Sequence, residues 1–237
     1  MKSLQDSLRL FATYEHSCPY LPEKSAVNAI VDPKYPMNMS MYSQMIDDGY
    51  RRSGKQVYRP YCPDCNECIA TRIPVAKFSP SRSQKRIWKR NQDLIVTENH
   101  KGFSEEYVEL YTHYTDTRHA DSELEDDSVE NFALFVETDW SDTIFYEFRK
   151  DEQLVCVAAV DVLERGLSAV YTFFDPDISS KRSLGTYAVL WEIEEAKRLG
   201  LSYVYPGYWI KESPKMNYKT RFHPIYGRVN GQWILLN

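Results

Sequence analysis

The sequence predicts an α+β fold, a mixed sheet with flanking helices, preceded by a cysteine-containing N-terminal region. Three strand-like segments follow one another over 143–149, 153–163 and 167–174, joined by short polar turns. The third of these strands also begins a strand–helix–strand unit over 168–205. Such a crossover places its two strands parallel in one sheet, so the meander and the crossover together predict a mixed sheet. Three of the five cysteines lie upstream, between residues 62 and 68.

The bulk composition indicates a folded protein with a substantial core. The chain has 237 residues, of which 43% are hydrophobic and 27% charged, as in typical globular proteins. The longest purely apolar run, Leu154 to Val160, is too short to cross a bilayer, and the first residues contain no secretory segment. We therefore expect a cytoplasmic protein with no membrane partner, whose cysteines are reduced or metal-bound. The sequence leaves the oligomeric state open.

Charge is distributed unevenly along the chain. Residues 49–92 contain eleven Lys and Arg against two acidic residues, whereas residues 104–142 contain thirteen Asp and Glu against one Arg. A basic segment in an acidic protein favours a local polyanion site, for which nucleic acid is the usual candidate. The alternative is that solvated faces happen to segregate charge. The composition change near residue 100 predicts two domains, 1–100 and 101–237.

The N-terminal segments predict short elements. We expect a strand at 26–31 and a helix that begins at an N-cap Ser40 and ends at Gly49. Residues 51–55 are interpreted as a basic turn, and a strand follows at 56–61.

The next segments predict a strand at 69–75 and three helices. The first helix, at 81–91, carries the five cations Arg82, Lys85, Arg86, Lys89 and Arg90. The other two are acidic and are expected at 105–119 and 128–137. Their apolar residues recur at helical spacing.

The C-terminal segment is organised around one long helix. Asp175-Pro176 breaks the preceding strand, and apolar residues at helical spacing predict a helix at 184–199. Its first half is expected to be buried and its second half, from Glu192 onward, to be solvated. Gly200 stands where a glycine ends a helix. A strand is expected at 201–205.

The last segment predicts a loop and a hairpin. Pro206-Gly207 is expected to open the loop. Asn230-Gly231 is the sequence of a type I′ turn between two antiparallel strands.

The turn before the long helix has the composition of an anion site. It contains Lys181, Arg182 and Gly185. Free backbone N–H groups at a helix start attract an anion, and a nearby Arg can bind it bidentately. This turn and the strand order together resemble the core of the GNAT acyltransferase superfamily, in which such a turn holds a pyrophosphate. A capped helix with a solvated basic turn is the alternative.

The cysteine spacing predicts a metal site. Cys62, Cys65 and Cys68 form two overlapping C-x-x-C pairs, which turn thiolates toward one point. Cys18 is the other cysteine of the N-terminal half and the candidate fourth ligand. Four thiolates suit zinc or an iron–sulfur cluster in a structural role, and reduced structural thiols are the alternative. Cys156 lies in a hydrophobic strand and is interpreted as a core residue.

Short motifs along nearly the whole chain resemble one family. They are Cys18-Pro19-Tyr20-Leu21, 50–54, 58–62, 72–75, 81–86, Arg118-His119, 168–176, 183–187, 207–210 and 215–219. Together they resemble the arginyl-tRNA–protein transferase family, and its bacterial branch in particular. The resemblance implies that leucine moves from leucyl-tRNA to the N-terminal amine of a protein beginning with Asp or Glu. It also implies that the modified protein is degraded by the N-end rule pathway.

The implied chemistry is attack by a neutral amine on an ester, which needs no cofactor. It needs orientation, a proton acceptor and stabilisation of an oxyanion. Asp175 is the first candidate for binding the amine or accepting its proton, and a turn-forming Asp before proline is the alternative. Tyr171 and His223 are further candidates.

The resemblance also implies how tRNA is held. Tyr187 stands where coenzyme A-binding loops usually have a small residue, and a tyrosine there could pack on a nucleoside or ribose. We therefore expect the turn, with Lys181, Arg182 and Gly185, to hold the tRNA 3′ end. The helix at 81–91 would contact phosphates of the acceptor stem, which needs no base readout.

An acidic acceptor residue needs a cation in its pocket. The candidates are Arg51, Arg52, Lys215, Lys219 and Arg221. Arg52 is the first choice, because a guanidinium can bind both carboxylate oxygens. Tyr208 and Trp209 offer base stacking or a leucine pocket, with ordinary core as the alternative.

The residues alone leave three other functions open. One is arginyl transfer by the same mechanism. Another is a GNAT acetyltransferase that uses acetyl-coenzyme A, against which Tyr187 counts. The third is a non-catalytic RNA-binding module, against which the developed C-terminal core counts.

Overall fold

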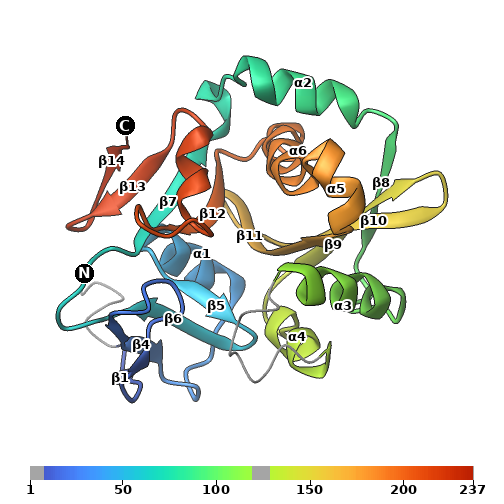
Figure 1. Ribbon diagram of the computed structural model, residues 1–237. Coiled ribbons are helices and arrows are strands. Elements are labelled where there is room, and N and C mark those ends of the chain that lie inside the picture. The colour runs from blue at the N-terminus through green and yellow to red at the C-terminus, as the bar shows by residue number, and fades with distance from the viewer. Residues whose placement is uncertain (1–7, 119–128, 237) are drawn as a thin grey trace.

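The computed structural model describes residues 8–118 and 129–236. At its centre is an eight-stranded mixed sheet in the order β14-β13-β7-β12-β11-β10-β9-β8 (Figure 1). Its strands are β7 (Ile69–Pro74), β8 (Leu94–Asn99), β9 (Thr143–Lys150), β10 (Gln153–Val162), β11 (Gly166–Phe174), β12 (Tyr203–Trp209), β13 (Tyr226–Val229) and β14 (Gln232–Leu235). The β11–β12 pair is parallel and the other neighbours are antiparallel. The predicted α+β fold with a mixed sheet is confirmed.

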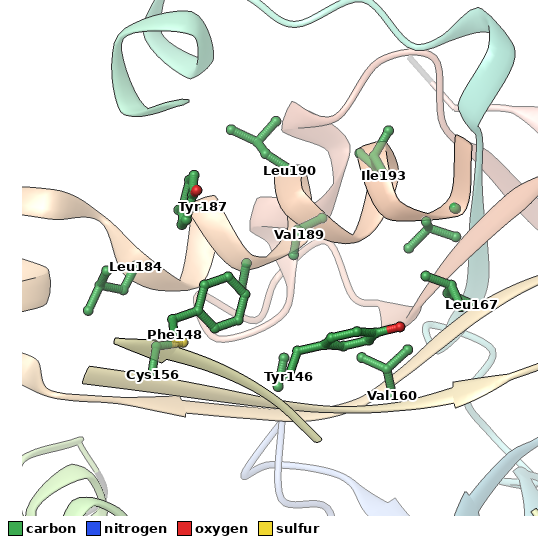
Figure 2. Packing of buried hydrophobic residues seen from close by; sticks show 14 of the residues in the cluster. Tyr146, Phe148, Cys156, Val160, Leu167, Leu184, Tyr187, Val189, Leu190 and Ile193 are labelled. Carbon is green, nitrogen blue, oxygen red and sulfur yellow. The ribbon is translucent and has the colours of Figure 1, made fainter. Parts of the chain in front are cut away.

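Helices cover both faces of this sheet (Figure 1). One face carries α2 (Arg82–Arg90), α5 (Pro176–Arg182) and α6 (Leu184–Arg198), and the other carries α3 (Glu106–Arg118) and α4 (Val129–Val136). Figure 2 shows the core under α6, where Tyr146, Phe148 and Cys156 of the sheet meet the helix. Burying these apolar surfaces on both faces is the main stabilisation of such a layered fold.

The N-terminal segment builds a smaller layer below the sheet. A four-stranded sheet has the order β1-β4-β6-β5, with β1 (Leu10–Ala12), β4 (Asn28–Val31), β5 (Arg51–Ser53) and β6 (Gln56–Pro60). A two-stranded ribbon pairs β2 (His16–Ser17) with β3 (Ser25–Ala26). Helix α1 (Met39–Asp47) buries Tyr42, Met45 and Ile46. Two 3₁₀ helices, η2 (Val75–Lys77) and η3 (Asn217–Arg221), complete the described elements.

The start of α1 corrects one prediction, since Asn38 and not Ser40 is the N-cap. The Asn38 side chain accepts a hydrogen bond from the Met41 amide at 3.0 Å. Asn serves this role as well as Ser does, so composition alone did not separate the two residues.

The basic segment 51–55 is also different from its prediction. Arg51–Ser53 is strand β5, paired with β6, so the turn is confined to Gly54 and Lys55. The pairing buries Arg52 and leaves Lys55 exposed. This strand arrangement decides the roles of Arg51 and Arg52 described below.

Three further differences lie elsewhere in the chain. Strand β8, which was not predicted, pairs with β9 along its whole length. Residues 206–207 lie inside β12 rather than in a loop, because the strand passes a bulge there. Asp175 is the N-cap of the short helix α5, whose first residue is Pro176.

Several local signals are confirmed. The helix predicted at 81–91 is α2, and the structure shows a capping box of Ser81 and Gln84 at its start. Gly200 has a φ of 71° directly after α6, and Asn230 and Gly231 have φ angles of 49° and 76° at the β13–β14 turn. These left-handed conformations are the ones that Gly and Asn adopt at low cost.

The sheet takes strands from both sides of residue 100, since β7 and β8 precede it and the other six strands follow it. The division of the chain near residue 100 stays a prediction. His119, part of one family motif, lies outside the described residues. Within the described ranges, no helix has the length and apolar character needed to cross a membrane.

Candidate functional site

The sheet opens between its two parallel strands. β11 and β12 pair only from Gly166–Tyr203 to Ser168–Tyr205, although β11 runs on to Phe174 and β12 to Trp209. The pairing of β12 with β7 shifts register between Val204 and Gly207. A bulge of this kind bends a strand and ends its pairing. We call this divergence of β11 from β12 the fork.

Arg51 of β5 occupies the fork from the side of the N-terminal layer. Its Nη1 donates hydrogen bonds to Ser168 Oγ at 3.0 Å and to the Tyr205 carbonyl at 3.1 Å, and its Nη2 donates to the Ala169 carbonyl. The guanidinium therefore connects the last residues of the two strands that still pair with each other.

Glu192 of α6 is a buried carboxylate that was predicted to be solvated. Its side chain is 0% exposed, and neither carboxylate oxygen has a hydrogen-bond partner within the described ranges. Burial raises its pKa to about 8, and Arg51 opposes this rise. An unpaired buried carboxylate is costly when charged, so Glu192 is mostly protonated at pH 7.

Lys219 of η3 is a buried amine. It is 3% exposed; its Nζ lies 3.3 Å from Met216 Sδ and 4.9 Å from the centroid of the Tyr218 ring. Burial, together with the smaller effect of the Arg51 charge, lowers its pKa to about 7. Glu192 and Lys219 therefore both titrate near neutral pH, and both are influenced by Arg51.

Tyr208 and Trp209 point to opposite faces of β12, as neighbours in a strand do. The Tyr208 hydroxyl donates to the Gly49 carbonyl at 2.9 Å, on the side of the N-terminal layer. Trp209 therefore points to the opposite face of the strand, and its Nε1 is buried with no hydrogen-bond partner in the part of the chain that the structure describes.

The four N-terminal cysteines line one pocket. Cys18, Cys62, Cys65 and Cys68 border a cavity of about 590 Å³ together with Tyr58 and Tyr208, among others. All four are free thiols. Burial and the three neighbouring thiols raise the pKa of Cys68 to about 12. Four thiols are a donor set of the kind that binds zinc or an iron–sulfur cluster.

The sulfur atoms of these cysteines are not gathered to coordination distance. Across residues 8–118 and 129–236, the one group of His, Cys, Asp or Glu with at least three ligand atoms mutually within 4.8 Å is His113, Asp175 and Asp177. Binding a metal at the cysteines would therefore require the loops that carry them to draw together.

Arg52 cannot serve as the predicted cation for an acidic substrate. Its Nε and Nη2 bind the two carboxylate oxygens of Asp161 at 2.7 Å each, and both side chains are 0% exposed. Nη2 also donates to the Val136 carbonyl at 2.9 Å. The guanidinium is thus fully engaged in a buried structural ion pair, and the prediction for Arg52 was wrong.

The turn before α6 does not present an open anion site. Arg182 binds both oxygens of Asp93 at 2.7 and 2.8 Å, and the Leu184 amide donates to Ser179 Oγ at 3.1 Å. A Cβ atom on Gly185 would lie 2.9 Å from the Phe174 ring, so the glycine is required for packing. The exposed Lys181 is the remaining cation of the turn.

Tyr187 packs in the core rather than on an open surface. It is 4% exposed, and its ring centroid lies 5.4 Å from that of Trp88 on α2. It also lies 5.8 Å from the ring centroid of Phe148 on β9, and Figure 2 shows these two residues. In this position it has no free face for a nucleoside or ribose.

The three catalytic candidates from the sequence lie apart from one another. Asp175 Oδ1 caps α5 by accepting hydrogen bonds from the Asp177 and Ile178 amides at 2.9 and 3.0 Å. Tyr171 packs in the aromatic cluster under α3 and α4, with its centroid 5.1 Å from that of Phe132. His223 is exposed beyond η3. The capping role of Asp175 agrees with the alternative interpretation from the sequence, a turn-forming Asp before proline.

The other candidate cations lie on the surface. Lys215 and Arg221 are exposed near η3. On α2 all five predicted cations are exposed, and they follow the i, i+3, i+4, i+7, i+8 spacing of one helical face. Within residues 8–118 and 129–236 none of the five forms an ion pair with an acidic side chain. This face is therefore available to a polyanion.

Glu192 is the residue that sequence reasoning missed. It was grouped with the charged residues that follow it, but it stands four residues after Ala188 and eight after Leu184, both of which are buried. Helical spacing therefore placed Glu192 on the buried face. A carboxylate on the buried face of a helix predicts a raised pKa, because burial disfavours the charged form.

A buried acid and a buried amine with pKa values near neutral, in an α+β fold, are features typical of an enzyme. The chain belongs to the arginine-tRNA–protein transferase family. Residues 16–86 match the N-terminal part of that family and residues 106–228 match its C-terminal part.

Curated relatives extend this match to nearly the whole chain. It is 50% identical over 230 residues to an aspartate/glutamate leucyltransferase of Pseudomonas fluorescens, and 50% identical over 229 residues to one of Pseudomonas aeruginosa. Each comparison covers 97% of both chains. Among solved structures, the chain is similar to L-PGS from Bacillus licheniformis, with a TM-score of 0.46 and 11% identity over 73% of this chain and 50% of that one.

Proposed function

We propose that this chain is an aminoacyl-tRNA–protein transferase that moves leucine from leucyl-tRNA to the N-terminal amine of proteins beginning with Asp or Glu. The observation that carries the proposal is the 50% identity to aspartate/glutamate leucyltransferases over 97% of both chains. The exposed cationic face of α2 supports a tRNA substrate. In a bacterial cell the transferred leucine would mark its carrier for degradation by the N-end rule pathway.

The chemistry is one acyl transfer. The nitrogen of a neutral amine bonds to the ester carbonyl carbon, and the bond from that carbon to the ribose oxygen breaks. The amine loses one proton, and the departing oxygen gains one. Near pH 7 Lys219 is partly neutral and can accept the first proton, whereas the protonated Glu192 can donate the second. Both side chains are buried, so substrate binding must open a path to them.

The acidic acceptor residue needs a cation other than Arg52. Lys215 precedes η3 and Arg221 is its last residue; both are exposed, and the same element carries Lys219. We assign the acceptor carboxylate to one of these two, because Arg51 is occupied by backbone carbonyls.

The donor is tested by offering tRNA charged with radiolabelled leucine or arginine, together with peptides beginning with Asp, Glu, Lys or Ala. Transfer of leucine to the Asp and Glu peptides is expected. Transfer of arginine instead would support the arginyl alternative. No transfer, together with saturable binding of coenzyme A, would support a GNAT acetyltransferase.

The tRNA surface gives a prediction. Replacing Lys85, Arg86 and Lys89 together by alanine should weaken leucyl-tRNA binding and reduce the slope of log affinity against log salt by about one for each phosphate that is no longer neutralised. Binding is measured by filter retention across a salt series. The control replaces the exposed Lys34, Lys55 and Lys150, which changes the net charge equally. An unchanged slope in the α2 variant would place the tRNA elsewhere.

The cysteines give a second prediction. We propose that Cys18, Cys62, Cys65 and Cys68 hold one structural zinc ion or iron–sulfur cluster, in support of which the four thiols share a pocket. Metal analysis should then find about one site per chain, and Cys62→Ser or Cys65→Ser should lose the metal and lower the melting temperature. Cys156→Ser should keep the metal. Four titratable free thiols in a fully active enzyme would contradict this assignment.

The finer description of fold and compartment is also proposed. We interpret residues 101–237 as a GNAT-like aminoacyl-transfer domain and residues 1–100 as a domain with the cysteine knuckle and the basic helix. The parallel β11–β12 pair joined through α6 supports this interpretation. Because aminoacyl-tRNA is the donor, we place the protein in the cytoplasm.

A further inference from the structure

The strands of the fork end their pairing at the residues that Arg51 contacts. The last pair is Ser168–Tyr205, and the guanidinium binds Ser168 Oγ, the Tyr205 carbonyl and the Ala169 carbonyl. A carbonyl left without a donor at such a position is costly. Arg51 satisfies one carbonyl from each strand while keeping the strands apart.

The shape of a guanidinium suits this position. It presents five N–H donors in a planar fork, whereas a lysine presents a single rotatable ammonium group. Gly207, two residues beyond Tyr205 of the last pair, has a φ of 95°, a conformation that favours glycine. A Cβ atom there would lie 3.8 Å from Arg51 Nη2, so the bent strand passes next to the guanidinium.

The charge of Arg51 also suits the reaction. Two carbonyl oxygens that pointed freely into the fork would repel the oxyanion that forms from an ester, and the guanidinium neutralises them. We propose that Arg51 is a positioning residue. It holds the two strands of the fork apart, and it neutralises the carbonyl oxygens that would otherwise repel the oxyanion formed from the ester of the aminoacyl-tRNA. This inference rests on the proposed function for the identity of the ester.

Arg51 should also influence the pH dependence of transfer. The other titratable groups around Glu192 are Tyr218 of η3, Cys156 of β10 and Tyr146 of β9. Around Lys219, Arg51 is the cation that adds to burial, and Met216 and Tyr218 are its neutral neighbours. Because Arg51 lowers the pKa of Glu192 and of Lys219, removal of its charge should raise both.

The experiment compares Arg51→Lys, which keeps the charge, with Arg51→Met, which removes it. Leucine transfer to an Asp-initiated peptide is measured over about pH 6 to 9 with saturating leucyl-tRNA. Arg51→Lys should lower kcat by about 100-fold, the scale of a small misplacement of reacting groups, with the peptide KM and the pH profile unchanged. Arg51→Met should lower kcat at least as much and shift the profile to higher pH. Lys55→Ala, in the same hairpin, should match the wild type.

Amide hydrogen exchange gives a second readout that does not depend on activity. Arg51→Lys should change protection in residues 168–172 and 205–209 and leave α3 and α4 unchanged. A wild-type kcat in Arg51→Lys with only a lowered melting temperature, or unchanged exchange at the fork, would overturn the inference. A wild-type enzyme that transfers no leucine would instead overturn the proposed function, while the exchange experiment would still test the role of Arg51.

Discussion

Replacing Arg52 by alanine is expected to lower the free energy of unfolding by about 3–5 kcal/mol, because the substitution leaves the Asp161 carboxylate buried without its partner. The pair is closed from solvent, with two contacts of 2.7 Å. Tyr42 and Thr143 also donate to Asp161, at 2.8 and 2.7 Å, but neither supplies a positive charge. Urea denaturation followed by circular dichroism measures the loss.

The control for Arg52 lies three residues away. Lys55 pairs with Asp139 at 2.8 Å, but the two side chains are 66% and 68% exposed, so Lys55→Ala should change stability by less than about 1 kcal/mol. The role of Arg52 is structural if Arg52→Ala loses several kcal/mol and any remaining folded enzyme still prefers Asp over Asn acceptors. A fully stable Arg52→Ala protein that no longer distinguishes those acceptors would contradict this account.

Replacing Glu192 by glutamine is expected to remove a pH dependence of stability. The folded-state pKa of about 8 stands above the ordinary value of 4.5, so the stability linked to this group is present below pH 4.5 and is lost as the pH rises through 8. The wild type should therefore lose up to about 1.4 kcal/mol per pH unit relative to Glu192→Gln, to a limit of about 5 kcal/mol.

This measurement is best made between about pH 5 and 7. Lys219, whose folded-state pKa of about 7 lies below the ordinary 10.5, contributes the opposite slope from about pH 7 upward, since its stability is lost as the pH falls through 7. Glu194→Gln is the matched control, because Glu194 is exposed on the same helix and pairs with Lys197. Equal pH slopes for the wild type and Glu192→Gln would show that Glu192 is ionised in the folded protein.

Local signals in the sequence predicted most of the framework. The helix at 81–91, the buried first half of α6 and the Asn230-Gly231 turn are each decided within a few residues, so periodicity and turn chemistry identify them. Strand β8 was missed because its pairing with β9 joins residues about fifty positions apart. No local pattern reports such a pairing.

The candidate site was harder to predict for the same reason. Arg51 and Arg52 are neighbours in sequence, yet strand alternation sends one to the fork and the other to Asp161. Their partners lie more than a hundred residues away, so sequence could name both cations but could not separate their roles. Asp175 is the opposite case. The residues next to it in sequence were enough to predict its turn-forming role, but they could not test the catalytic role that was also predicted for it.

The central claim is most directly tested by mass spectrometry of two peptides that differ only in their first residue, Asp or Asn, after incubation with the enzyme and leucyl-tRNA. The account predicts that the Asp peptide gains one leucine on its N-terminal amine. The Asn peptide should react about ten- to a hundredfold more slowly, since a charged hydrogen-bonded group is worth about 1.5–3 kcal/mol over its neutral counterpart. No leucine on either peptide, or equal rates on both, would contradict it.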